Sequence, residues 1–536
     1  MRELLSKLDQ HKSMGPDSIH PKLLVSLSRN SDFVCALTLL FRKCYERGNA
    51  PSIWKTANVS AIHKKGTTTE AKNYRPISLT CILSKIYEKL IRKHVLNHVT
   101  PLISKQQHGF MEGKSCLSNL LEFIDAINDL LANGECVDIF YMDFQKAFDT
   151  VPHYRLLSKL RGYGINGKTL AAISDFLSGR TFGVVVGDHC SSTYPVTSGI
   201  PQGSVLGPLL FLLYINDLPE GIQSSISLFA DDVKMLAKAA GKDQTQQDID
   251  SMCEWQDTWL LEFNTKDGKC KVLHVGKDNP SHNYYLKGLP LPVVKSERDL
   301  GVYVEQSLEW DVHIQKCIGK AKGVIAWVSR NVITRSPEVM VNLYKTVVRP
   351  HLEYCVQLWS PYPRHGNWEI IMAVEGVQRM YTRLIDGVGL LPYETRLSKL
   401  KLTTLLERRA RGDLIETFRI VTGIANYGSN LFRKSPYGDN LIARTGTNDK
   451  RKCDFFSNRV LKYWNRLPYD VKSAKNVDTF KSRLGSFKDK NPGRSQQYWE
   501  LSQEIFSRIS DSDRNSYVTF MSSNPYIAKA KGINIK

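Results

Sequence analysis

Three carboxylates in the middle of the chain fall where apolar runs end. Asp231 and Asp232 lie between two short apolar runs, 226–229 and 233–236, and this pattern predicts a β-hairpin with both acids at its turn. An Asp-Asp turn by itself is most often only a solvated turn. Asp143, however, ends another apolar run, and two strand ends that deliver acids to one place could chelate a pair of Mg²⁺ ions. The three acids are therefore candidates for two-metal phosphoryl transfer.

Basic residues lie on a second predicted hairpin, nearer the N-terminus. The alternating residues 58–63 turn at Lys64 and Lys65, and residues 73–78 return with Arg75. Arg binds phosphate through two parallel hydrogen bonds and Lys acts as a point charge, so these side chains could hold a triphosphate. Three basic residues on a hairpin are also typical of a solvated face, and both interpretations stay open on this pattern.

Two residues between the acids could contact a nucleotide. Phe148 follows Asp143 by five residues and could crowd the 2′ position of a sugar, although a core aromatic is the alternative. Gln202 lies in a Pro-Gln-Gly turn that enters a helix, and such a turn suits a phosphate or a base pair. Asp149 is interpreted as the cap of a helix that begins near Pro152.

The remaining patterns indicate a mixed helix and sheet protein. Two helical patterns fill the first 50 residues, and Pro21 enters the second. Further helices are predicted at residues 81–99, 116–131, 204–217, 244–261 and, in several pieces, 310–423. Further strands are predicted at residues 137–142, 182–186, 192–197 and 263–275, and residues 284–286 and 299–304 are expected to complete one hairpin. Residues 427–449 look loop-like, and residues 488–536 form a polar tail.

Composition narrows the class of protein. With 536 residues, 42% of them hydrophobic, the chain is expected to form two to four globular domains. Lys and Arg number 73 against 53 Asp and Glu, and the resulting charge of +20 suggests a nucleic acid partner, with an ordinary basic protein as the alternative. The 11 cysteines form no CxxC pair, which argues against a zinc module. Without a secretory signal or a long apolar run, the sequence predicts an intracellular protein with no membrane partner.

The order of these motifs closely resembles a reverse transcriptase. Five stretches resemble the sequence of the enzyme of animal non-LTR (LINE-type, Jockey-like) retrotransposons. These stretches are NYRPISLTCILSKIYEKLI, QHGFMEGKSC, YMDFQKAFDTVPH, SGIPQGSVLGPLLFLLYINDLP and SLFADD. Two later stretches resemble the downstream region of those elements: YKTVVRPHLEYCVQLWSPY and FFSNRVLKYWNRLP. The similarity covers residues 5–485.

This resemblance implies a fold and a set of domains. The fold would be α+β, a right-hand polymerase with fingers, a palm built on an antiparallel sheet, and a helical thumb, followed by a helical C-terminal region. The implied boundaries are fingers with N-terminal helices at 1–130, palm at 131–305, thumb at 306–400, C-terminal region at 401–487 and polar tail at 488–536, with the reverse transcriptase domain at about 45–305.

The resemblance also implies roles at the site. The catalytic carboxylates would be Asp143, Asp231 and Asp232, which with the carbonyl of Phe144 would bind two Mg²⁺ ions, or Mn²⁺ as an alternative. Nucleotide contacts would come from the fingers, from a steric gate against ribonucleotides, from the Pro-Gln-Gly turn and from a palm lysine that protonates pyrophosphate. These positions match Lys64 or Lys65, Arg75, Phe148, Gln202 and, in a register made difficult by Lys266, Lys269.

The resemblance therefore predicts an RNA-directed DNA polymerase that extends a primer with dNTPs on an RNA template. Its partners would be the RNA, a DNA or RNA primer and dNTPs, in ribonucleoprotein of the cytoplasm and nucleus. Autonomous relatives carry an endonuclease before the polymerase, and we expect this chain to lack it. Two alternatives stay open: a catalytically silent, element-derived RNA-binding protein, and a reverse transcriptase of the intron-maturase kind. The intact acids favour activity, and the C-terminal similarity argues against a maturase.

Overall fold

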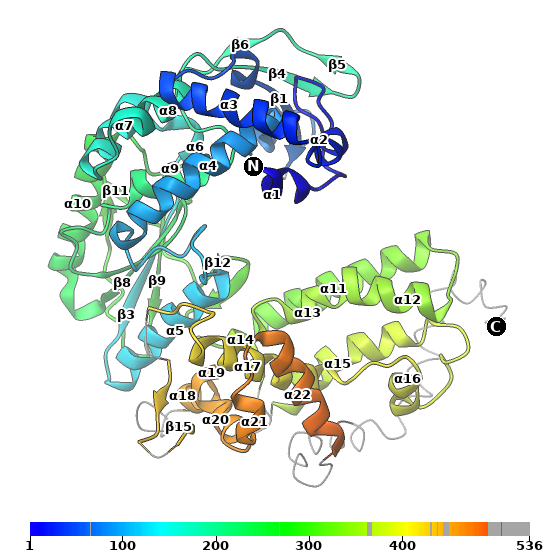
Figure 1. The fold of residues 1–536 in the computed structure, drawn as a ribbon. Helices are drawn as coiled ribbons and strands as arrows, with labels where there is room; N and C mark the ends of the chain where they lie inside the picture. The colour runs from blue at the N-terminus through cyan, green and yellow to red at the C-terminus, as the bar shows by residue number, and fades with distance from the viewer. Residues whose placement is uncertain are drawn as a thin grey trace. The chain divides into compact units, whose positions relative to one another are not determined.

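The structure is a computed structural model that describes residues 1–64, 66–266, 268–361, 367–428, 431–436, 438–442, 450–490 and 505. It comprises two compact units, each made of segments that are separate in sequence. The first unit consists of Met1–Met111, Asp138–Val272 and Ser281–Val293, and the second of Glu112–Val137, Leu273–Pro280 and Val294–Lys536. Figure 1 shows the elements of both units along the chain.

The first unit contains a five-stranded sheet that carries the predicted basic hairpin. Its strands are β1 (Thr56–His63), β2 (Tyr74–Leu79), β4 (Thr181–Val186), β5 (His189–Cys190) and β6 (Tyr194–Pro195). The strand order is β2-β1-β4-β5, and β6 also pairs with β4. Strands β1 and β2 are antiparallel, with Ile62 opposite Arg75, so the predicted hairpin is confirmed. Strand β1 pairs in parallel with β4, a long-range contact that local patterns do not encode.

A second sheet carries the predicted acids. Its four strands, in spatial order, are β7 (Ser225–Phe229), β8 (Asp232–Lys238), β3 (Val137–Met142) and β9 (Lys271–Val275). Every residue of β3 is buried, which explains why its sequence is a nearly continuous apolar run. Strands β7 and β8 are antiparallel, with Phe229 opposite Asp232, so the predicted hairpin is confirmed, although Asp232 begins β8 and only Asp231 lies in the turn.

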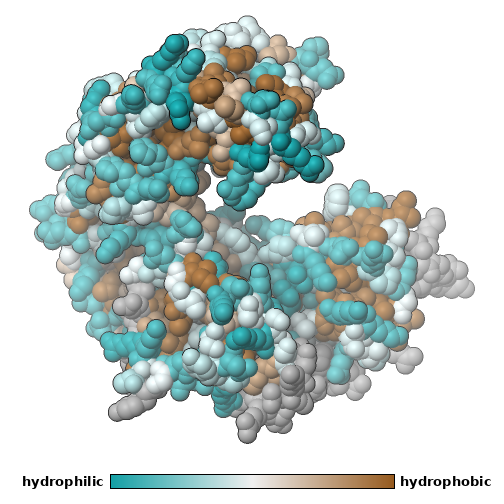
Figure 2. Space-filling model, viewed as in Figure 1, coloured by the Kyte–Doolittle hydropathy of each residue, from teal (hydrophilic) through white to brown (hydrophobic). Residues whose placement is uncertain are grey.

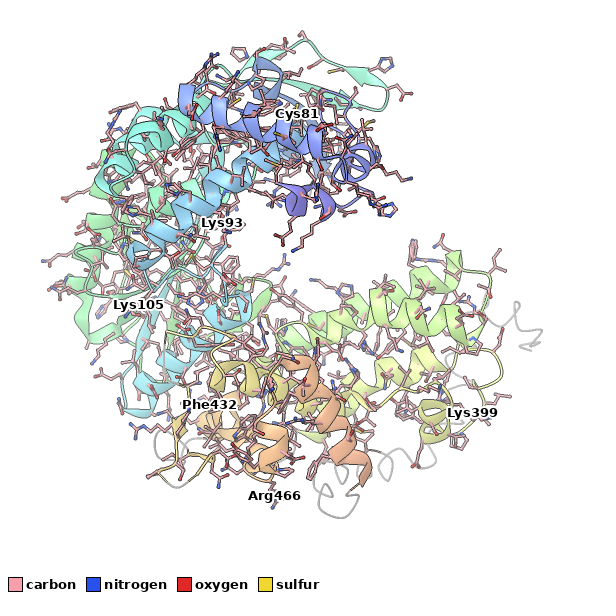
Figure 3. All side chains as sticks on the ribbon, in the orientation of Figure 1. Cys81, Lys93, Lys105, Lys399, Phe432 and Arg466 are labelled. Carbon is pink, nitrogen blue, oxygen red and sulfur yellow. The ribbon has the colours of Figure 1, made fainter. Side chains whose placement is uncertain are left out.

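Helices cover these sheets. The helices of the first unit are α1 (Arg2–Ser6), α2 (Pro21–Leu27), α3 (Ser31–Arg47), α4 (Ile82–Val99), α6 (Ala147–Thr150), α7 (His153–Gly162), α8 (Gly167–Leu177), α9 (Gly207–Ile215) and α10 (Lys242–Trp259), with short 3₁₀ turns η1 (Ser52–Lys55), η2 (Ala71–Asn73), η3 (Thr100–Leu102) and η4 (Ala239–Gly241). Helix α9 is apolar on all sides and almost wholly buried, as its sequence predicts. In Figure 3, Cys81 and Lys93 mark the start and the middle of α4.

Several local expectations differ from the structure. The strand predicted at 263–275 is limited to β9 (Lys271–Val275). The first 50 residues form three helices, because Asn30 interrupts the second predicted helix and caps α3 through its side chain. Helix α9 begins at Gly207, later than predicted, because residues 201–206 form turns before it. The expected hairpin of 284–286 with 299–304 is wrong. Instead, the structure has two separate hairpins: β10 (Tyr285–Leu286) with β11 (Leu289–Pro290), and β12 (Ser296–Asp299) with β13 (Val302–Glu305).

The second unit is mainly helical, as the sequence predicts. Its helices are α5 (Cys116–Ala132), α11 (Asp311–Asn331), α12 (Pro337–Leu343), the π-helix η5 (Tyr344–Val348), α13 (Pro350–Glu353), α14 (Val356–Trp359), α15 (Trp368–Thr382), α16 (Tyr393–Lys399), α17 (Leu405–Val421), α18 (Lys450–Asp454), α19 (Phe456–Arg459), α20 (Leu461–Trp464), α21 (Tyr469–Lys472) and α22 (Val477–Lys490). A small hairpin of β14 (Arg433–Lys434) and β15 (Leu441–Ile442) lies in the region predicted as a loop. Most of the predicted tail lies outside the described residues.

The face of the molecule drawn in Figure 2 is mostly polar. Figure 2 shows hydrophilic side chains over most of the visible face, with hydrophobic ones scattered among them. Among the described residues, no single helix has the length and apolar character needed to cross a membrane. Helices α2 and α3 together reach that length, but they are bent by 114° with respect to each other, and such a pair is weak evidence for a span.

Candidate active site

The acid turn joins β7 to β8 through only two residues, Ala230 and Asp231. Ala230 has a positive φ of 55°, a conformation that hairpin turns of two residues often require at their first position. Asp231 is half-buried, and Asp232, which opens β8, is exposed. Asp143 follows β3 directly, and β3 is the neighbour of β8 in the sheet. The structure thus brings the three predicted acids to one edge of one sheet.

Acidic and basic groups both act on the pKa of Asp231. Burial raises the pKa of Asp231 above its usual value, and the negative charge of Asp143 raises it further. Arg75 and Lys64, both from the basic hairpin, oppose this rise in the pKa. The acids and the basic hairpin therefore face one another across a single region of the first unit.

Asp143 is held by hydrogen bonds from Lys269 and Asn264. Its Oδ2 accepts hydrogen bonds from Lys269 Nζ at 3.0 Å and from Asn264 Nδ2 at 3.4 Å. Its backbone carbonyl accepts a hydrogen bond from the Asn264 N–H at 2.6 Å. The predicted palm lysine, Lys269, thus lies against the acid despite the difficult register. The sequence analysis did not identify Asn264, because a single Asn after Phe263 carries no local signal of this contact.

The backbone after Asp143 leaves one oxygen unused. Phe144 forms an isolated antiparallel bridge with Phe263, and the two rings stack with their centroids 4.4 Å apart. The hydrogen bonds of this bridge are made by flanking residues, including Gln145 N–H to the Glu262 carbonyl at 2.8 Å. Within the described residues, no hydrogen bond uses the Phe144 carbonyl. This oxygen is therefore available as a ligand, as the resemblance implies.

The donors fit a magnesium ion in their chemistry. Carboxylates and a backbone carbonyl are the hard oxygen ligands that Mg²⁺ prefers. In the part of the chain that the structure describes, no three His, Cys, Asp or Glu side chains lie close enough together to hold a metal ion by themselves. Like charges repel, and the Asp143 carboxylate is turned toward Lys269. The negative charge of Asp143 raises the pKa of Asp231, and a cation between the two carboxylates would offset this repulsion.

A large cleft in the first unit collects nearly all of the candidate residues. It has a volume of about 1590 Å³. The candidate residues that line it are Lys64, Arg75, Asp143, Phe144, Phe148, Gln202, Asp231, Asp232 and Lys269. Lys65, the alternative to Lys64, lies outside the described residues. Segments far apart in the sequence thus contribute to one open cleft that is large enough for a nucleotide.

Phe148 takes part in both the core and the cleft. Its ring stacks on Phe211 of the buried helix α9 with the centroids 4.4 Å apart. The side chain is half-buried and also lines the cleft. The two interpretations of this residue are therefore compatible, because one face of the ring packs inward and the rest remains at the site.

The interpretation of Asp149 as a helix cap is wrong. Asp149 lies within the short helix α6, whereas α7 begins after Pro152 and has no side-chain cap. The carboxylate instead accepts a hydrogen bond from Gln202 Nε2 at 3.0 Å. The backbone carbonyl of Gln202 accepts a hydrogen bond from the Ser78 N–H at 2.7 Å. Gln202 is thus held by both its side chain and its main chain.

A buried acid that the sequence analysis missed supports the Pro-Gln-Gly turn. Glu88 is only 1% exposed, and its carboxylate accepts hydrogen bonds from the N–H groups of Val205 at 2.7 Å and Leu206 at 3.1 Å. These N–H groups precede α9, so a carboxylate there satisfies donors that the helix cannot. Burial raises the pKa of Glu88 above its usual value. An acid on the apolar face of a predicted helix is the signal that could have revealed it.

Comparisons with known proteins find similar chains. Residues 62–309 match the family model described as reverse transcriptase (RNA-dependent DNA polymerase). The chain is 26% identical, over 76% of its length and 46% of the relative's, to the probable RNA-directed DNA polymerase from transposon X-element of Drosophila melanogaster. It is 29% identical, over 67% of its length and 41% of the relative's, to the RNA-directed DNA polymerase from mobile element jockey of the same species.

The chain therefore spans less than half the length of these curated relatives. A solved structure of apo telomerase from Candida tropicalis aligns with a TM-score of 0.36 and 12% identity over 55% of this chain and 62% of that one. The fold is that of a right-hand polymerase, as the matched domain and its acid-bearing sheet indicate. Residues 62–309 are therefore similar to the reverse transcriptase family, and the relatives that match the chain are RNA-directed DNA polymerases of mobile elements.

Proposed function

We propose that the chain is an RNA-directed DNA polymerase that extends a primer 3′-OH with dNTPs on an RNA template. The observation that carries the proposal is the meeting of Asp143 and Asp231 at one cleft that also contains Arg75. The primer oxygen would form a new bond to the α-phosphorus of the dNTP, and the bond from that phosphorus to the β-phosphate oxygen would break. Pyrophosphate would leave, and the primer would grow by one nucleotide.

The acids would hold the metal ions of this reaction. Asp143, Asp231 and Asp232, with the Phe144 carbonyl, are the proposed ligands of two Mg²⁺ ions, which supply activation of the primer hydroxyl and neutralisation of the triphosphate charge. Lys64 and Arg75, which line the same cleft, would bind the triphosphate oxygens. Reactions of this kind depend chiefly on positioning and on charge neutralisation, which this arrangement of residues favours.

Three further residues would take part in nucleotide binding and in the release of pyrophosphate. Lys269, whose ammonium group donates to Asp143, would pass a proton to the pyrophosphate oxygen that leaves. Phe148 would close the space that a ribose 2′-OH needs. Gln202 would pack on the incoming nucleotide, held by Asp149. Each of these roles follows from the resemblance and is supported by the position of the side chain in the cleft.

We also propose the partners, the regions and the site of action that such an activity requires. Template RNA and a primer would bind by their phosphates, so binding should weaken steeply as salt rises. Fingers at 1–130, palm at 131–305, thumb at 306–400 and a C-terminal region at 401–487 remain our assignment of the chain. The protein would act inside the cell, with its RNA, in the cytoplasm and nucleus.

Primer extension on an RNA template tests the proposal. Wild type should extend the primer with Mg²⁺ present, and Asp231→Asn, which keeps the shape of the side chain but not its charge, should lose at least about a hundredfold in rate. Asp243→Asn, at an exposed position of α10, is the matched control and should extend as wild type does. If RNA binding persists in all variants and none extends the primer, the protein is an RNA-binding protein and the proposal is wrong.

A further inference from the structure

A loop that contains residues 106–109 runs along β7, the strand that leads into the acid turn. Lys105, labelled in Figure 3, stands just before this loop. The Leu228 N–H of β7 donates to the Gln106 carbonyl at 3.0 Å, and the His108 N–H donates to the Leu228 carbonyl at 2.9 Å. Gln107 and Leu228 thus form a short parallel bridge. The loop extends the ladder of hydrogen bonds on the edge of β7.

The side chain of Gln107 reaches from this loop to the turn itself. Its Oε1 accepts hydrogen bonds from the Ala230 N–H at 2.9 Å and from the Gly109 N–H at 2.7 Å. Both partners are donors, so the amide must present its oxygen to them. Gln107 is only 2% exposed, and its Nε2 has no hydrogen-bond partner within the described residues. Only the acceptor end of this buried amide is therefore in use.

The backbone that Gln107 holds is a strained one. Ala230 has a φ of 55°, which is unfavourable for a residue with a Cβ and is usually taken by glycine. Gly109 packs directly behind it, and a Cβ at Gly109 would collide with the Ala230 nitrogen. A strained turn persists only where its surroundings determine its conformation. Here the surroundings are the Gln107 amide and the bare backbone of Gly109.

We propose that Gln107 is a positioning residue for the acid turn. By accepting the Ala230 hydrogen bond, it holds the turn in the conformation that directs Asp231 into the cleft. Neither the sequence patterns nor the resemblance assigns it this role. The effect on catalysis rests on the proposed polymerase function, whereas the effect on the conformation of the turn does not. These two consequences can be measured separately.

Hydrogen exchange tests the conformation of the turn without any activity. Gln107→Met keeps the length of the side chain and removes the acceptor, so the Ala230 amide should exchange about tenfold faster or more in a peptide covering residues 226–236. Gln107→Glu keeps an acceptor oxygen and should preserve this protection. Gln106→Met is the matched control, since the side chain of Gln106 is exposed, and its exchange at Ala230 should equal that of wild type.

Primer extension tests the consequence for catalysis. In Gln107→Met the kcat should fall about tenfold or more, whereas the primer–template Kd should stay within about twofold, because the acids move and the binding surface does not. Gln107→Glu should recover part of the loss, and Gln106→Met should match wild type. A purely structural role would instead lower the folded fraction, seen by circular dichroism, and leave the kcat of the folded protein unchanged.

The outcomes separate the two proposals. If wild type does not extend primers, the proposed function fails, and the exchange measurement still decides whether Gln107 holds the turn. If wild type extends primers and Gln107→Met keeps both the wild-type kcat and the wild-type protection of Ala230, the positioning role is overturned. Should Gln107→Met not fold, a folded Gln107→Glu that loses protection at Ala230 would overturn the role equally.

Discussion

The side-chain amide of Gln202 donates a hydrogen bond to the carboxylate of Asp149 across 3.0 Å. The two residues come from different segments that are also joined through their backbones, since the Ile200 N–H donates to the Phe148 carbonyl at 2.7 Å. The Asp149 carboxylate can only accept, so the amide nitrogen of Gln202 faces it and the amide oxygen is directed elsewhere. Asp149 therefore fixes the orientation of the residue that we expect to pack on the incoming nucleotide.

Asp149→Ala should raise the KM for dNTPs, because it removes the acceptor that orients Gln202. Without its acceptor, the amide is free to rotate, and we expect the KM for dNTPs to rise about tenfold, the equivalent of one hydrogen bond to a charged group. Asp149→Asn, which keeps an acceptor oxygen, should recover most of the affinity. Steady-state primer extension measures both. An unchanged KM in Asp149→Ala, or equal losses when Gln202 is already replaced by Met, would show that Asp149 does not act through Gln202.

Phe148→Ala should relax the discrimination between dNTPs and rNTPs. The ring occupies the cleft beside the site, so its removal opens the space that a 2′-OH needs, and we expect rNTP incorporation to rise at least about tenfold relative to dNTP. The lost stacking on Phe211 should also cost about 3 kcal/mol in the free energy of unfolding. Phe33→Ala, at another half-buried position of the first unit, controls for stability alone and should leave the ratio unchanged.

His313 should make the second unit sensitive to acid. The side chain is 3% exposed, its Nδ1 accepts a hydrogen bond from the Tyr303 N–H at 3.2 Å, and burial lowers its pKa to about 4. The unfolded chain, with an ordinary pKa near 6.5, takes up a proton below that pH while the folded protein does not. The free energy of unfolding should therefore fall as the pH drops from about 6.5 to about 4, by up to about 3 kcal/mol.

Urea unfolding at several pH values, followed by circular dichroism, measures this dependence. His313→Asn keeps an acceptor near the position of Nδ1 and removes the titrating group, so its stability should fall less steeply over the same range. His11→Asn, at an exposed position of the first unit, should retain the slope of wild type. Equal slopes for wild type and His313→Asn would contradict the assignment of the effect to His313.

The protein should be more stable when Lys159 and Asp217 are both present, or both replaced, than when only one of them is replaced. Lys159 Nζ lies 2.5 Å from Asp217 Oδ1 and 3.8 Å from the centroid of the Trp259 ring, and its side chain is 3% exposed. Lys159→Met leaves a partly buried carboxylate without its cation, and we expect a loss of about 3 kcal/mol in the free energy of unfolding. The double variant with Asp217→Asn should recover part of that loss. Additive losses would show that the two side chains do not interact.

Local patterns determined many of the elements in both units. The acid hairpin, the basic hairpin and helices α4, α5 and α10 follow from the spacing of apolar residues and from turn residues, because each of these signals lies within a few residues of the structure it specifies. The types and order of Asp143, Asp231 and Asp232 also indicated the chemistry, and the resemblance narrowed it to reverse transcriptases, whose family model residues 62–309 match. The roles of the individual site residues stay predictions.

Only the tertiary structure decided which distant groups meet. Asp149 bonds to Gln202 rather than to its own helix, Asn264 and Lys269 hold Asp143, and Gln107 reaches Ala230 across 123 positions. A hydrogen bond between segments this far apart imposes no periodicity and no turn on either of them, so no local sequence pattern predicts it. The sequence alone thus identified the three candidate acids. The residues that hold the site in place were determined by the tertiary structure, because they come from distant segments.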